Sequence, residues 1–227
     1  MSAWMRQPQG YWPHFAALGY ALAGYAGGLW CMTTQPAWLN ALGTLALAHA
    51  LVIAAYLLHE CAHNTVFADP RHNARLGEVL SFLVGAAYVD YAVIRHKHMR
   101  HHTDRADVVA LDFRRLLLRR PWLRRTVEAL EWAWIPAVDL LMHGLVLVLP
   151  FVLPQRHHQR RRVLILLAIR GALLWALAWM SAQAVVLYAL AYLLFLHVLR
   201  FMDVHQHTYI SVEALDRGRA GRPAERD

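Results

Sequence analysis

The sequence predicts an all-α integral membrane protein, with about four transmembrane helices in two hairpins, additional interfacial helices and a cytoplasmic metal site lined by histidines. Three observations predict this architecture. The 227-residue chain is 58% hydrophobic and carries a formal net charge of +8, which together favour a membrane protein with a basic aqueous face. Four apolar segments approach the length of a membrane span, and histidines cluster at the ends of two of them.

A helix needs about 20 apolar residues to cross the hydrocarbon core of a bilayer. The segments that meet this requirement lie at about residues 12–31, 37–58, 163–180 and 184–202. The first is too long and too aromatic for a signal peptide, and only Arg6 provides positive charge before it. Two cysteines, Cys31 and Cys61, are too few for a disulfide framework.

Two further apolar runs, at about 79–94 and 135–153, contain polar residues or prolines. Their sequences predict interfacial or re-entrant helices rather than complete spans. The connections at 32–36 and 181–184 contain no Lys or Arg, whereas "RRLLLRRPWLRR" (114–125), "QRHHQRRR" (155–162) and the C-terminal tail are strongly basic. The positive-inside rule therefore predicts that both termini and both long polar segments are cytoplasmic.

Histidines recur where the second span ends. In "HECAH", His59 and His63 are four residues apart, so on a helix they share one face and can bind one metal ion. In "HMRHH", His98 is three and four residues before His101 and His102 and shares a face with both on a helix. An isolated pair of this kind is more often a solvated pair, and the second stretch alone could face anionic lipid.

A third cluster lies at the end of the fourth span, where Asp203 and His207 are again four residues apart. Three clusters from distant parts of the chain thus converge on the same membrane boundary. Ionisable groups there are costly unless they are paired, bound to metal or functional. The clusters therefore predict metal binding, while the other histidines, among them His14, His49, His72 and His143, have no partner at a useful spacing.

The motif "HECAH" also fits H-E-x-x-H, the zinc protease pattern in which the glutamate acts as general base. That alternative leaves the later histidines without a role, because catalytic zinc needs three protein ligands and an open position. A pair of iron ions would use all of them, since iron accepts imidazole readily. A redox-active iron pair can activate dioxygen, and the membrane spans can enclose a dry tunnel for an acyl chain.

The segments "HECAHNTVF", "HMRHHTDRADVV" and "FMDVHQHTY" resemble the first histidine box, the second histidine box and the fourth-span segment of membrane fatty acid desaturases, especially bacterial ones. The resemblance covers about residues 40–209, and it implies O2-dependent insertion of a double bond into an acyl chain at a di-iron centre. It implies that the catalytic iron ligands are His59, His63, His98, His101, His102 and His207, with Asp203 as a further polar or water-mediated ligand.

The resemblance also implies particular partners. The substrate would be an acyl lipid or acyl thioester in the membrane, and electrons would come from a ferredoxin or cytochrome, because the sequence shows no nucleotide-binding loop, haem or iron-sulfur motif. The basic loops offer such acidic donors a docking field, although topology and lipid head-group contact explain the same charge. Nucleic acid binding is a poor explanation, because the charge follows the membrane-flanking loops.

One feature departs from the family pattern. Desaturases of this kind carry a third box, H-x-x-H-H, after the fourth-span segment, and no histidine follows His207 here. We therefore expect a desaturase-like domain over 1–209, truncated at its C-terminal end, and a disordered or aberrant tail over 210–227. If the site needs all three boxes, the chain as written would be inactive or would depend on a missing segment. A lipid hydroxylase of the same superfamily, an intramembrane zinc protease and a non-enzymatic metal-binding protein remain alternatives.

Overall fold

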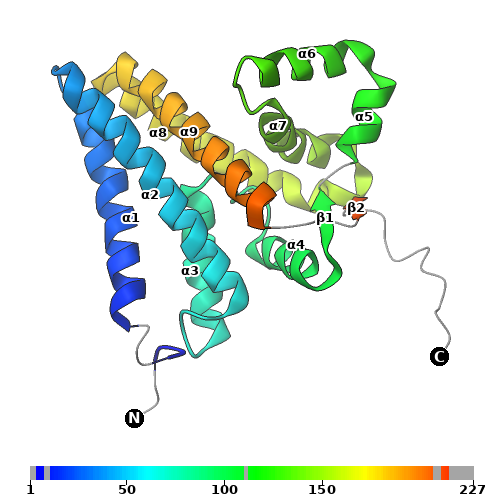
Figure 1. Ribbon diagram of the computed structural model, residues 1–227, viewed down its shortest axis with the longest axis horizontal. Coiled ribbons are helices and arrows are strands. Elements are labelled where there is room, and N and C mark those ends of the chain that lie inside the picture. Colours follow the sequence, from blue (N-terminus) through cyan, green and yellow to red (C-terminus); the bar gives the residue numbers. More distant parts are fainter. Residues whose placement is uncertain (1–3, 8–10, 110–111, 207–210, 215–227) are drawn as a thin grey trace.

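The computed structural model describes residues 4–7, 11–109, 112–206 and 211–214, and this part of the chain is almost entirely helical (Figure 1). Its α-helices are α1 (Tyr11–Met32), α2 (Ala37–His63), α3 (Pro70–Leu83), α4 (Tyr91–Asp104), α5 (Phe113–Arg119), α6 (Pro121–Trp132), α7 (Ala137–Val152), α8 (Arg160–Met180) and α9 (Ala182–Gln206). A 3-10 helix, η2 (Pro154–Gln159), precedes α8. The prediction of an all-α architecture is confirmed.

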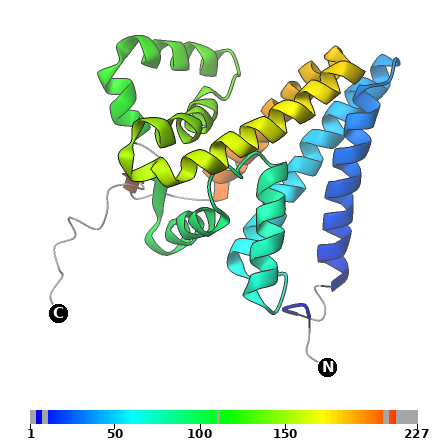
Figure 2. The same ribbon diagram turned by 180° about the vertical axis from the view of Figure 1, so that it is seen from behind.

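The long helices form two hairpins, α1 with α2 and α8 with α9, and α9 packs against α2 (Figures 1 and 2). Glycines let α1 and α2 approach closely: a Cβ atom on Gly28 would lie 2.9 Å from the carbonyl oxygen of Gly43. Near the turn of the first hairpin, buried Asn40 donates to the carbonyls of Cys31 and Thr34, both at 3.0 Å, and accepts from Gln183 at 2.9 Å. This residue links the two hairpins.

Four helical segments within the described residues are long and apolar enough to cross a membrane: Tyr11–Met32, Ala37–His63, Pro154–Met180 and Ala182–Asp203. They correspond to the four predicted spans. Large apolar side chains on α8, such as Trp175 and Trp179, are exposed in the protein alone. Such exposure is what a lipid-facing helix requires, because lipid rather than protein covers these side chains.

The apolar run at 79–94, for which the sequence predicts an interfacial or re-entrant helix, is divided between two helices. It contains the end of α3, a loop and the start of α4. Gly85 breaks the run with a φ of +85°, and a Cβ atom there would lie 2.2 Å from the hydroxyl of Tyr192. The other run does form a helix, α7, which is apolar but shorter than a span.

Helices α5, α6 and α7 lie on the opposite side of the α8–α9 hairpin from α1 and α2 (Figures 1 and 2). Arg200 on α9 ties this group to the bundle, because its guanidinium lies 2.5 Å from a Glu131 carboxylate oxygen and 3.4 Å from one of Asp139. The imidazole of His143 on α7 also lies 3.0 Å from the Tyr192 hydroxyl of α9.

The positive charge of Arg170 lies within the apolar helix α8. Its guanidinium donates a hydrogen bond to the carbonyl of Phe82 at the end of α3. The same group lies over the ring of Phe82, 4.8 Å from its centroid, and 5.5 Å from the ring centroid of Tyr88. The charge therefore faces protein groups rather than hydrocarbon.

A short parallel ladder joins two distant segments. Strand β1 (Ala106–Val109) follows α4 directly and pairs with β2 (Ser211–Ala214), with Ala106 opposite Ser211. The sequence predicts no regular element in either segment. Strand β2 lies within residues 210–227, the segment expected to be a disordered or aberrant tail. The rest of that segment lies outside the described part of the chain.

Candidate metal centre

The last turn of α2 presents the first pair of histidines. Their ring centroids lie 4.7 Å apart, so His59 and His63 do occupy one face of the helix. The helix ends directly after His63, because Asn64 adopts the left-handed conformation with a φ of 57° and its N–H bonds the Cys61 carbonyl at 3.0 Å. Thr65 adds a hydroxyl bond of 2.9 Å to the Glu60 carbonyl. This capping ends α2 directly after the pair.

Helix α4 presents the second pair. The Nε2 atoms of His98 and His102 lie 3.1 Å apart, one helical turn along the same face. His98 is half-buried, whereas His102 is exposed. In this pair, His98 therefore lies at the contact between α4 and α2, and His102 lies nearer solvent.

The two pairs converge. His98 Nε2 lies 2.9 Å from His63 Nε2, and the rings of His59 and His98 have centroids 4.3 Å apart. One ligand atom from each of the four residues lies within 4.8 Å of all the others. A metal–imidazole bond of about 2.0–2.1 Å places opposite ligands about 4 Å apart. Small side-chain rotations would thus bring all four nitrogens onto a single ion.

The electrostatics of the group favour a neutral ring at His98. Burial, and after it repulsion from the neighbouring histidines, first His59 and then His102 and His63, together lower the pKa of His98 from its ordinary value of 6.5 to about 3. A neutral imidazole has a free lone pair, which is the form that ligates a metal ion. The donor set therefore fits a transition metal.

Four of the seven predicted ligands are brought together, namely His59, His63, His98 and His102. His101 lies outside this group, with its ring centroid 6.0 Å from that of His98 and 5.4 Å from that of His102. On a helix a neighbour in sequence points about 100° away, so His101 and His102 cannot face α2 equally. Asp203, near the end of α9, is also outside the group, and His207 lies outside the described residues.

Sequence reasoning missed a side chain that joins the two ligand-bearing helices. Arg95 on α4 donates its Nε–H to the carbonyl of Ala62 on α2 at 2.9 Å. The available signal was its position three residues before His98, on the same helical face as that ligand. The acceptor is a backbone atom, which no side-chain pattern reveals.

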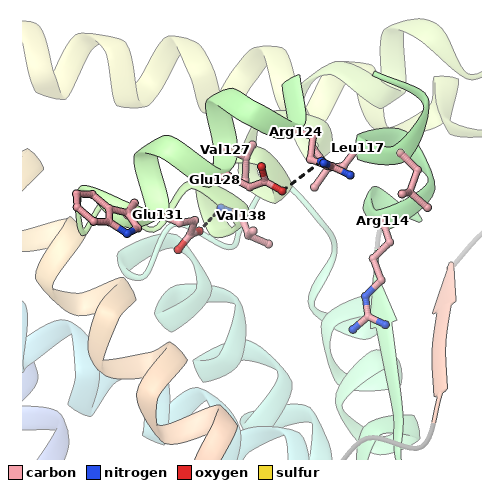
Figure 3. Close-up of a pocket in the computed structure, with 9 residues that line it drawn as sticks. Arg114, Leu117, Arg124, Val127, Glu128, Glu131 and Val138 are labelled. Carbon is pink, nitrogen blue, oxygen red and sulfur yellow. Dashed lines mark hydrogen bonds and ion pairs between the residues drawn. The ribbon is translucent and has the colours of Figure 1, made fainter. Parts of the chain in front are cut away.

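A pocket of about 660 Å³ lies elsewhere, among α5, α6 and the start of α7 (Figure 3). Apolar side chains line much of it, and Arg124 at its edge pairs with Glu128 at 3.2 Å. No residue of α2 or α4 lines this pocket. It is therefore separate from the histidine group.

Comparison with known proteins identifies the family. Neither a curated protein nor a solved structure matches the chain in the comparisons made. The family model described as fatty acid desaturase matches residues 36–226, which is more than half of the chain and includes all four grouped histidines. With its four apolar helices and its histidine group, the chain belongs to the fatty acid desaturase family.

Proposed function

We propose that this protein is a membrane fatty acid desaturase-like oxidoreductase, which uses O2 to insert a double bond into an acyl chain at an iron centre. The observation that carries the proposal is the convergence of His59, His63, His98 and His102 at the end of a helix long enough to span a membrane. Family membership supports the same reading.

The donor set suits iron, because neutral imidazoles bind redox-active iron readily. In this proposal the four grouped histidines would hold one iron ion, and His101, His207 and Asp203 would contribute to a second. An iron pair bound there would supply the O2-dependent oxidation of an unactivated C–H bond. The role of the chain is to hold neutral nitrogens in place and to keep the acyl chain in a dry, apolar setting.

The overall reaction requires an electron donor. Two hydrogens leave adjacent acyl carbons as a double bond forms, and with O2, two electrons and two protons they give two molecules of water. The two electrons come from an external donor of the ferredoxin or cytochrome class in this proposal. The basic segments 114–125 and 155–162 offer an acidic donor a complementary surface, and anionic lipid head groups are the competing partner.

We place the metal centre and both termini on the cytoplasmic side of a bacterial-type inner membrane. The basic segments flank the spans at that end, and the positive-inside rule assigns such segments to the cytoplasm. In this proposal residues 1–209 form the desaturase-like domain, and residues 210–227 form a separate tail.

Two alternatives can be compared with this proposal. A hydroxylase of the same superfamily would use the same ligands. A zinc protease would use His59 and His63 with Glu60 as base, but Thr65 holds the Glu60 carboxylate at 2.5 Å, and the two histidines of α4 add to the ligand set. A tetrahedral zinc ion with four protein nitrogens has no open position for substrate.

The test combines metal content with lipid analysis. The detergent-solubilised chain is expressed with iron and zinc both available and its metal content measured, while membrane acyl chains of the expressing cells are analysed by mass spectrometry. Iron in the protein together with new unsaturated chains, both lost in His63→Ala and kept in His157→Ala, would support the proposal. Hydroxylated chains would favour the hydroxylase. One zinc per chain with unchanged lipids would contradict both oxidative readings.

A further inference from the structure

We infer that Arg95 is a positioning residue of the metal centre, which holds α4 against the end of α2 so that the two histidine pairs face each other. Arg162 fixes the other end of α4 in the same arrangement. The inference rests on the proposed metal centre and goes beyond it, because it assigns a role to two side chains that do not ligate the metal.

The contact of Arg95 occurs at a helix end that needs a partner. The last four carbonyls of a helix have no N–H donor within the helix, and a cation there also interacts favourably with the helix dipole. At the end of α2, Asn64 and Thr65 bond the carbonyls of Cys61 and Glu60. The carbonyl of Ala62 instead accepts the Arg95 Nε–H at 2.9 Å, so this bond connects α2 to a different helix.

The bond lies directly beside the contact between the histidines. Ala62 precedes His63 by one residue, and Arg95 precedes His98 by three, which is about one helical turn. The Arg95–Ala62 bond and the His63–His98 contact, both 2.9 Å long, therefore join the same two helices at adjacent levels. A shift of α4 along α2 would break both together.

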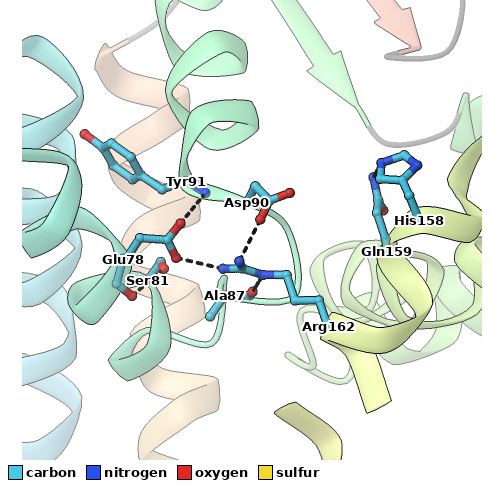
Figure 4. A network of polar contacts seen from close by, with 8 residues as sticks. All are labelled: Glu78, Ser81, Ala87, Asp90, Tyr91, His158, Gln159 and Arg162. Atoms are coloured by element: carbon cyan, nitrogen blue, oxygen red, sulfur yellow. Dashed lines mark hydrogen bonds and ion pairs between the residues drawn. The ribbon is translucent and has the colours of Figure 1, made fainter. Parts of the chain in front are cut away.

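The start of α4 is fixed by a second arginine (Figure 4). Arg162 at the beginning of α8 donates to the Ala87 carbonyl at 2.7 Å, to Asp90 at 2.6 Å and to Glu78 at 2.7 Å. The other carboxylate oxygen of Glu78 accepts the backbone N–H of Tyr91, the first residue of α4, at 3.2 Å. These hydrogen bonds connect α3, α8 and the start of α4 to one another.

The side chain of Tyr91 also limits rotation of α4, because it packs against α3. Its side chain is buried, and its ring lies so close to Gly77 of α3 that a Cβ atom there would be 2.1 Å from Cε2. Rotation of α4 about its axis would drive this ring into α3. The direction in which α4 presents His98 and His102 is thus set at one end by Arg162 and Tyr91, and near the ligands by Arg95.

A simple capping role for Arg95 makes a different prediction from a positioning role. Loss of a cap loosens the end of α2 whichever residue provides it, whereas loss of the inter-helix bond changes the distance between the histidine pairs. Thr65→Val is a comparison variant at the same helix end, because it removes the hydroxyl bonds to the Glu60 carbonyl and carboxylate without touching α4. Arg75→Met, on the exposed face of α3, controls for loss of an arginine.

The experiment titrates Co²⁺ into the full-length, metal-stripped chain in detergent and records the visible absorption of the bound ion and its Kd. Arg95→Met is expected to raise Kd by at least about tenfold and to alter the absorption bands, as loss of groups that orient ligands does. Arg95→Lys should recover part of the affinity, because it keeps the charge but lacks the planar fork of donors. Thr65→Val and Arg75→Met should retain the wild-type bands and Kd.

Each outcome decides the inference. Wild-type Kd and bands in Arg95→Met would overturn it, and so would an equal loss in Thr65→Val, which would indicate general loosening of the helix end. If Arg95→Met fails to fold, Arg95→Lys and Arg162→Gln provide the test, with weakened Co²⁺ binding in folded protein expected and wild-type binding contradicting it. Absence of Co²⁺ binding by the wild-type chain would reject the metal centre itself, and the two failures are thereby distinguished.

Discussion

The Nε2 atom of His98 lies 2.9 Å from the Nε2 atom of His63, although the two residues are 35 positions apart in the chain. Two imidazole nitrogens at this distance must share either a proton or a metal ion, because two lone pairs would repel. Metal binding through both Nε2 atoms therefore requires that the shared proton move to the Nδ1 atom of its ring. The contact makes α2 and α4 a single unit for metal binding.

Removal of His98 should abolish high-affinity metal binding. This residue contacts both His63 and His102 through its Nε2, so His98→Ala removes the central donor of the group. We expect Kd for Fe²⁺ or Co²⁺ to rise by more than about tenfold, since even loss of groups behind a ligand costs that much. Calorimetric titration of the detergent-solubilised protein measures the change. His157→Ala, at an exposed position in η2, should bind as the wild type does.

The metal-free protein should lose stability as the pH falls below about 6.5. Burial and the neighbouring histidines lower the pKa of His98 in the folded protein to about 3, whereas its ordinary value is 6.5. Between these values the unfolded chain binds a proton that the folded chain does not, so stability rises with pH across this window. Thermal unfolding in detergent from pH 4 to pH 8 measures the slope. His98→Gln should flatten it, and an unchanged slope would show that His98 does not contribute.

The metal centre should face the cytoplasm. Reporter fusions after residue 35, in the connection between α1 and α2, and after residue 158, before α8, test the two sides of the membrane. Alkaline phosphatase is expected to be active only at the first position and green fluorescent protein only at the second, because the second segment is strongly basic. The reverse pattern would place the histidines outside the cytoplasm.

Loss of Arg200 should destabilise the protein. Its guanidinium bridges Glu131 at 2.5 Å and Asp139 at 3.4 Å, so Arg200→Met leaves two partly buried carboxylates without this cation. Because the three side chains are about a third exposed, we expect a loss of about 1 kcal/mol, measured as a lower Tm. The matched control is Arg124→Met on α6, whose pair with Glu128 is more than half exposed on both sides. Equal effects of the two changes would contradict the assigned role of Arg200.

Adding a methyl group at Gly77 should weaken the contact between α3 and α4. A Cβ atom there would lie 2.1 Å from the buried ring of Tyr91, which must move to admit it. Overpacking of this kind costs about 1–3 kcal/mol. Gly144→Ala on α7 has open space around the new atom and should be neutral or stabilising. Comparison of the two Tm values checks the prediction, and a stable Gly77→Ala protein would contradict it.

The spans were predictable because each depends on local composition, a property that a run of apolar residues displays directly. The pairing of His59 with His63, and of His98 with His102, was also predictable, since a spacing of four places side chains on one helical face. The break at Gly85 was not, because it depends on a φ of +85° beside Tyr192, more than 100 residues later.

The roles of Arg95 and Arg162 beside the site could not be predicted from the sequence, for a related reason. Arg162 belongs to a basic segment that the positive-inside rule explains fully, yet in the structure it bonds the carbonyl of Ala87 and two carboxylates. The partner of Arg95 is a backbone oxygen 33 residues earlier in the chain. Contacts with backbone atoms leave no pattern of residue types, so only the three-dimensional arrangement reveals them.

The position of Arg170 has a consequence for biosynthesis. A guanidinium within an apolar helix is costly if it is surrounded by lipid alone. Here the Arg170 guanidinium donates a hydrogen bond to the Phe82 carbonyl and lies over the Phe82 ring. Phe82 precedes Arg170 by 88 residues, so its helix leaves the ribosome well before α8 does. The order of synthesis therefore supplies a protein acceptor before the charge arrives at the bilayer. Partition of α8 into the membrane is thereby coupled to packing against a helix already made.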